Sequence, residues 1–144
     1  MQNIPILAPA AALILCSLIV LLWVTATRFP ALAQARPKLR EVRGVSRYSD
    51  IEHLLPARVN WKSHNYTHLM EQPTLFYAVV AVLALAGEGS GVNLVLARGY
   101  VGLRVVHSLW QGLVNRLPVR IALFTLSSLC LLGLSINAVR VTVF

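Results

Sequence analysis

Four long apolar windows constrain this chain more than any other feature of its sequence. They cover residues 4–27, 67–86, 92–114 and 119–139, and each has about the 20 residues that one helical crossing of a bilayer needs. The composition agrees, because 57% of the 144 residues are hydrophobic and 12% are charged, unlike an ordinary soluble domain. We therefore predict an all-α, multi-pass integral membrane protein whose single domain, residues 1–144, is a four-helix bundle in the lipid bilayer.

The positive charge is concentrated in two connections between these windows, which hold ten of the thirteen basic residues. Segment 28–64 also contains Pro30, Pro37 and Pro56 and is expected to be a basic loop. Because positively charged connections stay in the cytoplasm, we expect both termini outside, in a bacterial inner membrane. The net charge of +8 is thereby explained by membrane orientation, and no nucleic-acid partner is expected. The basic residues of the two connections are Arg28, Arg36, Lys38, Arg40, Arg43, Arg47, Arg58, Lys62, Arg116 and Arg120.

The third window carries a polar stripe. Arg104, His107 and Gln111 are spaced i, i+3 and i+7, which places them on one face of a helix. Arg104 lies about 15 Å from the cytoplasmic end at the helical rise, and a charge at such depth costs at least about 2.5 kcal/mol unless it faces the bundle interior or a wet cavity. We predict that the stripe faces inward. Gly99 and Gly102 give the same helix a small-residue face for close helix approach.

A second polar face opens the second window. His64, His68 and Glu71 share one side of that helix by i, i+4 and i+7 spacing. In the predicted topology Glu71 can meet the stripe of the third window and Arg120 in the cytoplasmic leaflet. Either Glu71 and Arg104 neutralise each other to fix helix packing, or the excess positive charge forms a cavity for an anionic ligand. Two histidines one turn apart are a weak metal pattern, and we expect no metal.

Two stretches resemble a known family. "NYTHLMEQPTLFY" (residues 65–77) and "RVVHSLWQGLVNRLPVR" (residues 104–120) are similar to the MAPEG family, the membrane-associated proteins of eicosanoid and glutathione metabolism, in their bacterial form. The resemblance rests on Glu71 with Pro73, the Arg104-x-x-His107 pair and Arg120. It implies homotrimers of four-helix protomers, with a glutathione site between neighbouring subunits that is open toward the cytoplasm.

The resemblance also implies roles for individual residues. Glu71 would accept from the glutathione amine or backbone, and Arg104 and His107 would hold its polar groups. Arg120 would be catalytic, because a guanidinium beside a thiol lowers the thiol pKa and raises the thiolate fraction. Three further positions complete the expected glutathione-binding set. They are His68, where glutathione-using members usually have Asn; Gln111, where they often have Tyr; and Arg28, which matches an arginine near the end of the first helix.

Two functions follow from the resemblance. The first is a membrane-embedded, glutathione-dependent transferase or peroxidase acting on a lipophilic electrophile that reaches the site from the bilayer. The second is a non-catalytic protein that keeps the MAPEG scaffold and binds a lipid headgroup or small anion. Retention of Arg120 favours chemistry, whereas His68 and Gln111 favour the non-catalytic alternative.

Overall fold

Four helices make up most of the computed structural model, which describes residues 4–40, 42, 44 and 47–143. Two short 3-10 turns, η1 (Tyr48–Asp50) and η2 (Glu52–Leu54), lie between the first two helices, and the described residues contain no strand. The predicted all-α four-helix architecture is therefore confirmed. The helices are α1 (Leu7–Leu39), α2 (Ala57–Leu85), α3 (Gly91–Leu113) and α4 (Leu117–Val143).

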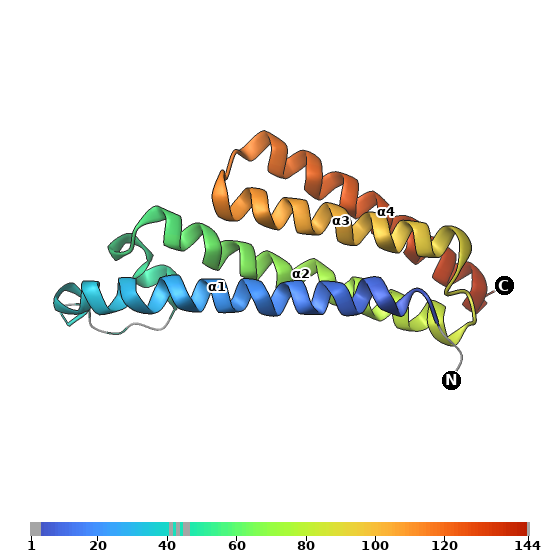
Figure 1. Cartoon of the computed structure of the whole chain (residues 1–144), viewed down its shortest axis with the longest axis horizontal. Coiled ribbons are helices and arrows are strands. Elements are labelled where there is room, and N and C mark those ends of the chain that lie inside the picture. The colour runs from blue at the N-terminus through green and yellow to red at the C-terminus, as the bar shows by residue number, and fades with distance from the viewer. Residues whose placement is uncertain (1–3, 41, 43, 45–46, 144) are drawn as a thin grey trace.

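The helices form two pairs, α1 with α2 and α3 with α4, packed into one bundle (Figure 1). Both termini lie at one end, together with the turn between α2 and α3. The α1–α2 connection and the turn between α3 and α4 lie at the opposite end, where α1 and α2 project beyond the other pair. The two basic connections are thus on the same side of the bundle.

The first two helices are longer than their apolar windows. α1 continues from the predicted boundary at residue 27 to Leu39, and α2 begins at Ala57, ten residues before the predicted start at 67. Most of the predicted loop 28–64 is therefore helical, and Arg43 within it lies outside the described residues. The physical reason is that charge marks where apolar surface ends, while a helix can continue in water. Pro30 and Pro37 lie inside α1 without ending it.

Three helices are long and apolar enough to cross a membrane: α1, α2 and α4, whose best windows have mean hydropathies of 2.6, 1.3 and 2.0. With 23 residues, α3 is about 34 Å long, enough to cross. Its polar stripe lowers its hydropathy, so its crossing remains a prediction from length.

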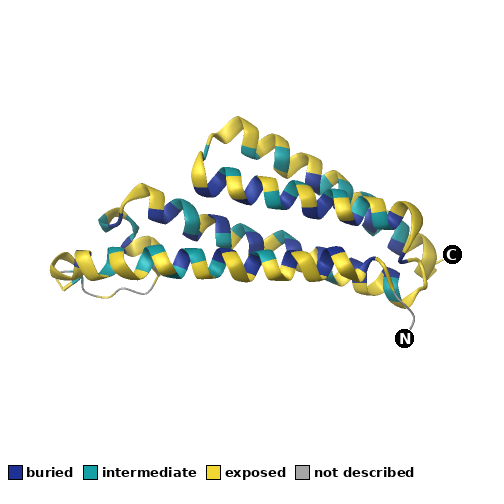
Figure 2. Ribbon diagram, viewed as in Figure 1, coloured by how far each residue is buried: buried dark blue, intermediate teal, exposed yellow. Residues whose placement is uncertain are grey.

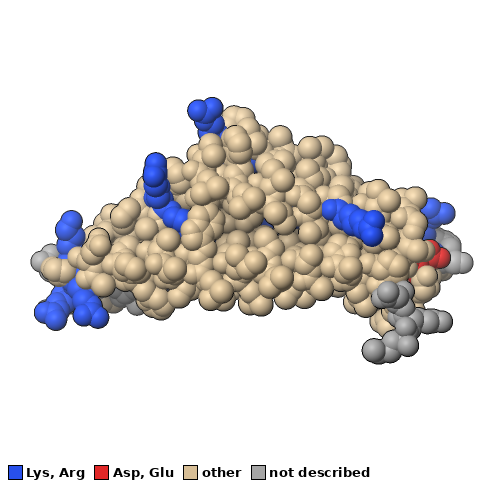
Figure 3. Space-filling view, in the orientation of Figure 1, with Lys and Arg blue, Asp and Glu red and all other residues tan. Residues whose placement is uncertain are grey.

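The outer faces of the bundle are apolar, and its interior combines a hydrophobic core with a smaller set of buried polar side chains. Apolar side chains on the outer faces are exposed, including Leu15 at 60%, Leu22 at 68% and Leu129 at 58%, and Figure 2 shows these faces as exposed along the length of the helices. Lys and Arg side chains gather at the end where α1 and α2 project, with few charges over the middle of the same view (Figure 3). This distribution suits helices whose outer surfaces contact lipid.

Candidate functional site

The polar stripe of α3 lies inside the bundle, as its spacing predicts. Arg104 is 0% exposed, His107 4% and Gln111 1%. Asn65 on α2 and Ser108 on α3 extend this buried polar interior, and the Asn65 Nδ2 donates to the Ser108 hydroxyl at 2.7 Å. The sequence analysis did not identify this bond, although Ser108 follows Arg104 by four residues and so shares its face.

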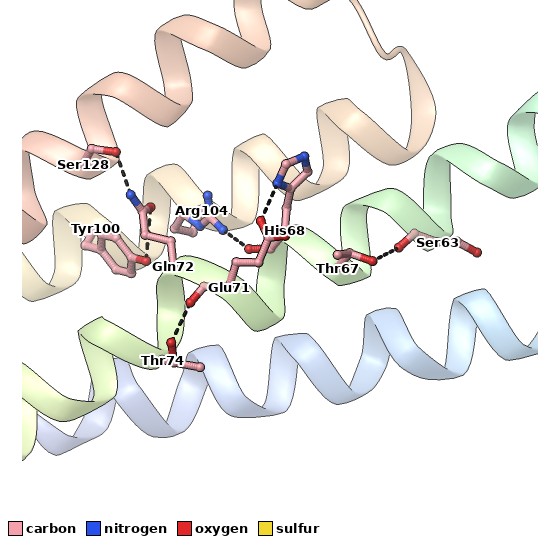
Figure 4. Close-up of polar contacts among 9 residues, drawn as sticks. All are labelled: Ser63, Thr67, His68, Glu71, Gln72, Thr74, Tyr100, Arg104 and Ser128. Atoms are coloured by element: carbon pink, nitrogen blue, oxygen red, sulfur yellow. Dashed lines mark hydrogen bonds and ion pairs between the residues drawn. The ribbon is translucent and has the colours of Figure 1, made fainter. Parts of the chain in front are cut away.

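Arg104 connects α3 to the backbone of α2. Its Nη2 donates to the carbonyl oxygen of His68 at 2.6 Å (Figure 4), and its guanidinium carbon lies 5.9 Å from the centroid of the Phe124 ring. Its Nε and Nη1 have no hydrogen-bond partner among the described residues. The Glu71–Arg104 ion pair, one of the two alternatives drawn from the sequence, does not form among those residues, because the backbone carbonyl of His68 on α2 accepts a hydrogen bond from the guanidinium instead.

Glu71 pairs with His68 and faces outward. One carboxylate oxygen lies 3.2 Å from the His68 Nδ1 (Figure 4), and 62% of the glutamate side chain is exposed, against 40% for His68. Glu71 lies four residues, about 6 Å at the helical rise, inside the apolar window that begins at residue 67. A carboxylate within an apolar segment is costly unless it is paired, and His68 is the partner that the described residues supply.

A small pocket unites three of the predicted site residues at the end of the bundle with the basic connections. Its volume is about 180 Å³. The rings of His68 and His107 meet edge to face at 6.4 Å between centroids, and His107 lies 6.5 Å from the Phe124 ring. Two imidazoles and a guanidinium therefore share one pocket with apolar walls. Its lining residues are His68, His107, Leu117, Arg120, Ile121 and Phe124.

The tight turn between α3 and α4 positions Arg120. Asn115 has a positive φ of 54°, a left-handed conformation that asparagine tolerates better than most residues. Pro118 lies in the first turn of α4, where its missing N–H costs nothing. Arg120 then folds back, and its Nη1 donates to the Asn115 Oδ1 at 2.8 Å. The turn thus fixes the guanidinium at the mouth of the pocket.

The remaining predicted residues do not line this pocket. Glu71 reaches it only through His68, and Arg104 lies behind it, bonded to α2. Gln111 is buried with both amide atoms unpartnered among the described residues, and Arg28 lies on α1. In the part of the chain that the structure describes, no three His, Cys, Asp or Glu residues come together as a possible metal site.

A second polar network crosses the bundle beside the site. The Gln72 Nε2 donates to the Ser128 hydroxyl at 2.7 Å, and the Tyr100 hydroxyl donates to the Gln72 Oε1 at 3.5 Å (Figure 4). Tyr100 also stacks on Phe76 at 4.4 Å between centroids. The sequence analysis missed this network, which couples α2, α3 and α4 below the pocket.

These features describe a helical membrane protein that has a buried polar stripe and a pocket lined by both charged and apolar side chains. The chain belongs to the MAPEG family, whose model matches residues 6–140. The family resemblance drawn from the two quoted stretches is thereby confirmed, as is a multi-pass integral membrane protein. The family includes both glutathione-dependent transferases and non-catalytic members. No curated protein and no solved structure matches the chain.

Proposed function

We propose that this protein is a glutathione-dependent transferase or peroxidase that acts on lipophilic electrophiles. The observation that carries the proposal is the pocket in which His68, His107 and Arg120 face Leu117, Ile121 and Phe124. A guanidinium suits a thiolate, and apolar walls suit a substrate dissolved in the bilayer. Catalysis is assigned to Arg120, the cation that lines the pocket.

Both reactions begin with the same thiolate. The thiol proton leaves to an imidazole or to water, and the Arg120 guanidinium stabilises the sulfur anion, lowering the thiol pKa. In conjugation the sulfur bonds to an electrophilic carbon; the bond to a leaving group breaks and that group departs as an anion, or, in an addition, the carbon–carbon π bond breaks and the neighbouring carbon takes up a proton. In peroxide reduction the sulfur attacks one peroxide oxygen and the O–O bond breaks; a second glutathione then gives the disulfide, and the peroxide becomes an alcohol and water.

The complete site is proposed to need neighbouring copies in a homotrimer. The pocket volume of about 180 Å³ is below the roughly 300–1,000 Å³ of ordinary ligand sites, so one chain encloses too little space for a tripeptide. Glu71 is exposed, and its carboxylate pairs only with His68 among the residues that the structure describes. In the trimer Glu71 would hold the glutathione amine or backbone, with His68, Arg104, His107, Gln111 and Arg28 as the expected binding set.

The proposed site faces the cytoplasm of a bacterium. The pocket lies where α3 ends and α4 begins, at the end of the bundle that carries the basic connections. The excess of Lys and Arg at that end supports a cytoplasmic orientation in the inner membrane, with both termini outside.

A non-catalytic scaffold protein is the second candidate. It is favoured by the use of both arginines within the chain, because Arg104 binds the His68 carbonyl and Arg120 binds the Asn115 amide oxygen. On this alternative the pocket holds a lipid headgroup or small anion without turnover.

Substitution of Arg120 distinguishes the two candidates. The ultraviolet absorbance of the thiolate is measured over a range of pH values for purified protein with bound glutathione. The wild type should lower the thiol pKa of bound glutathione, and Arg120→Leu should lose most of that depression and all turnover, with a smaller loss of binding. Arg116→Leu is the matched control, since Arg116 is exposed in the same turn and does not line the pocket. An unchanged thiol pKa in Arg120→Leu would remove Arg120 from the mechanism.

A further inference from the structure

A larger hollow lies at the opposite end of the bundle from the proposed glutathione site. Its volume is about 760 Å³. Asn93 in its wall and His107 in the small pocket are 14 residues apart on α3, a separation of about 21 Å. The hollow is therefore a separate site, formed by the α2–α3 turn, the start of α3 and the end of α4. Its lining residues are Glu88, Ser90, Gly91, Val92, Asn93, Asn137, Arg140 and Val141.

The floor of the hollow is a hydrogen-bonded frame. The Asn93 Nδ2 donates to the Glu88 carbonyl oxygen at 3.0 Å, and the Asn137 Nδ2 donates to the Asn93 Oδ1 at 2.7 Å. Asn93 is only 7% exposed, so these bonds fix the α2–α3 turn to both α3 and α4. The backbone that carries Glu88 and the ends of α3 and α4 are thereby held at set positions before any ligand arrives.

Two opposite charges line this frame without pairing. Glu88 and Arg140 are both exposed, and neither forms an ion pair with another residue in the described part of the chain. Ser90 precedes α3, but its hydroxyl does not cap the helix. A carboxylate, a guanidinium and a hydroxyl that does not cap α3 therefore border one space.

Exposed apolar residues adjoin the same hollow. Val92 is 68% exposed and Val141 41%, and Val95, one turn further along α3, is 66% exposed. The charged groups thus lie where the apolar outer surface of α3 and α4 ends, which is the level of lipid headgroups. A ligand with a charged head and an apolar tail would match both surfaces at once.

We propose that this hollow binds the headgroup of a zwitterionic phospholipid with a primary ammonium, as in phosphatidylethanolamine. The Arg140 guanidinium binds the phosphate and the Glu88 carboxylate accepts hydrogen bonds from the ammonium, while the acyl chains follow Val92 and Val95 along α3. Phosphatidylglycerol has no ammonium for Glu88. Phosphatidylcholine has a quaternary ammonium that cannot donate a hydrogen bond, so both should bind more weakly.

The test measures lipid retention by the full-length protein. Delipidated protein in mild detergent receives equal concentrations of phosphatidylethanolamine, phosphatidylglycerol and phosphatidylcholine, and bound lipid is read by native mass spectrometry. The wild type should retain phosphatidylethanolamine preferentially. Arg140→Gln should weaken that retention about tenfold, the loss expected for a charge-assisted hydrogen bond, whereas Arg98→Gln, which removes an exposed arginine of α3 outside the hollow, should not.

Two further experiments test the role of Glu88 and whether the ligand is a membrane lipid or a free headgroup. Glu88→Gln should abolish the preference for phosphatidylethanolamine over phosphatidylglycerol while leaving phosphatidylglycerol retention intact. Free phosphoethanolamine at the same concentration should not displace the lipid, because it lacks acyl chains. Equal retention by Arg140→Gln and Arg98→Gln, an unchanged preference in Glu88→Gln, or displacement by phosphoethanolamine would overturn the proposal. Unchanged helix content by circular dichroism shows that each variant is folded.

Discussion

Replacing Gly112 with alanine should displace the side chain of Trp23, through which α1 packs on α3 at this position. Gly112 is buried near the end of α3, and a Cβ atom there would lie 2.7 Å and 2.8 Å from the Cζ3 and Cη2 atoms of Trp23 on α1. Carbon atoms in contact are ordinarily about 3.5–4.0 Å apart. The indole ring would therefore have to move by about 1 Å, together with Lys62, whose ammonium lies 5.2 Å from the ring centroid.

The change in the free energy of unfolding follows from two opposing effects. Overpacking of this kind costs about 1–3 kcal/mol, while glycine to alanine in a helix gains about 1 kcal/mol. Gly102→Ala is the matched control, because it makes the same change in α3 where a Cβ atom meets nothing within 4 Å. The two alanine variants should thus differ by about 2 kcal/mol, and at about 2–4 °C per kcal/mol Gly112→Ala should unfold about 4–8 °C below Gly102→Ala.

The assay is thermal unfolding in mild detergent, followed by circular dichroism, with tryptophan fluorescence as a second measurement. Gly112→Ala should also change the fluorescence spectrum of the folded protein, since Trp23 is displaced, and Gly102→Ala should not. Equal unfolding temperatures and identical spectra for the two variants would refute the close packing of α1 on α3 at Gly112.

Three other predictions test the wider account. Reporters fused after Phe144 and within residues 90–92 should register outside the cell, because the basic connections hold the other face inside; a cytoplasmic C-terminus would contradict this. The mass of the protein in mild detergent should correspond to three copies, and a monomer would remove the argument that Glu71 is completed by a neighbouring copy. Ser108→Ala should lower the free energy of unfolding by about 1–3 kcal/mol, because it leaves the buried Asn65 amide without its partner. Adding Asn65→Leu should cost less than the sum of the two single changes, and strict additivity would show that the bond contributes nothing.

Four apolar windows of membrane-spanning length were sufficient to predict the four helices, and residue spacing was sufficient to predict the inward stripe of α3. The spacing of Arg104, His107 and Gln111 fixes one helical face, and that face is buried whatever packs against it. The predicted end of α1 and the predicted start of α2 were wrong, because hydropathy indicates where contact with lipid ends and not where a helix ends. α1 continues past both Pro30 and Pro37 to Leu39.

Partners across helices could not be predicted from spacing. Nothing in the order of residues distinguishes an Arg104–Glu71 pair from the observed bond to the His68 carbonyl, since both lie on the same stretch of α2. The glycine of α3 on which another helix packs most tightly is likewise Gly112, which lies against Trp23 of α1, and not Gly99 or Gly102. Such contacts depend on the rotation of one helix about its axis relative to the next, which only the folded bundle sets.

Binding of glutathione tests the central claim most directly. Detergent-purified full-length protein is titrated with glutathione in a calorimeter, and thermal unfolding is measured with and without the ligand. We predict saturable heat and a rise in the unfolding temperature, since a ligand that binds only the folded state stabilises it by about 2.7 kcal/mol at a hundredfold excess over its Kd. No heat and no thermal stabilisation at millimolar glutathione would contradict the account and leave the non-catalytic scaffold.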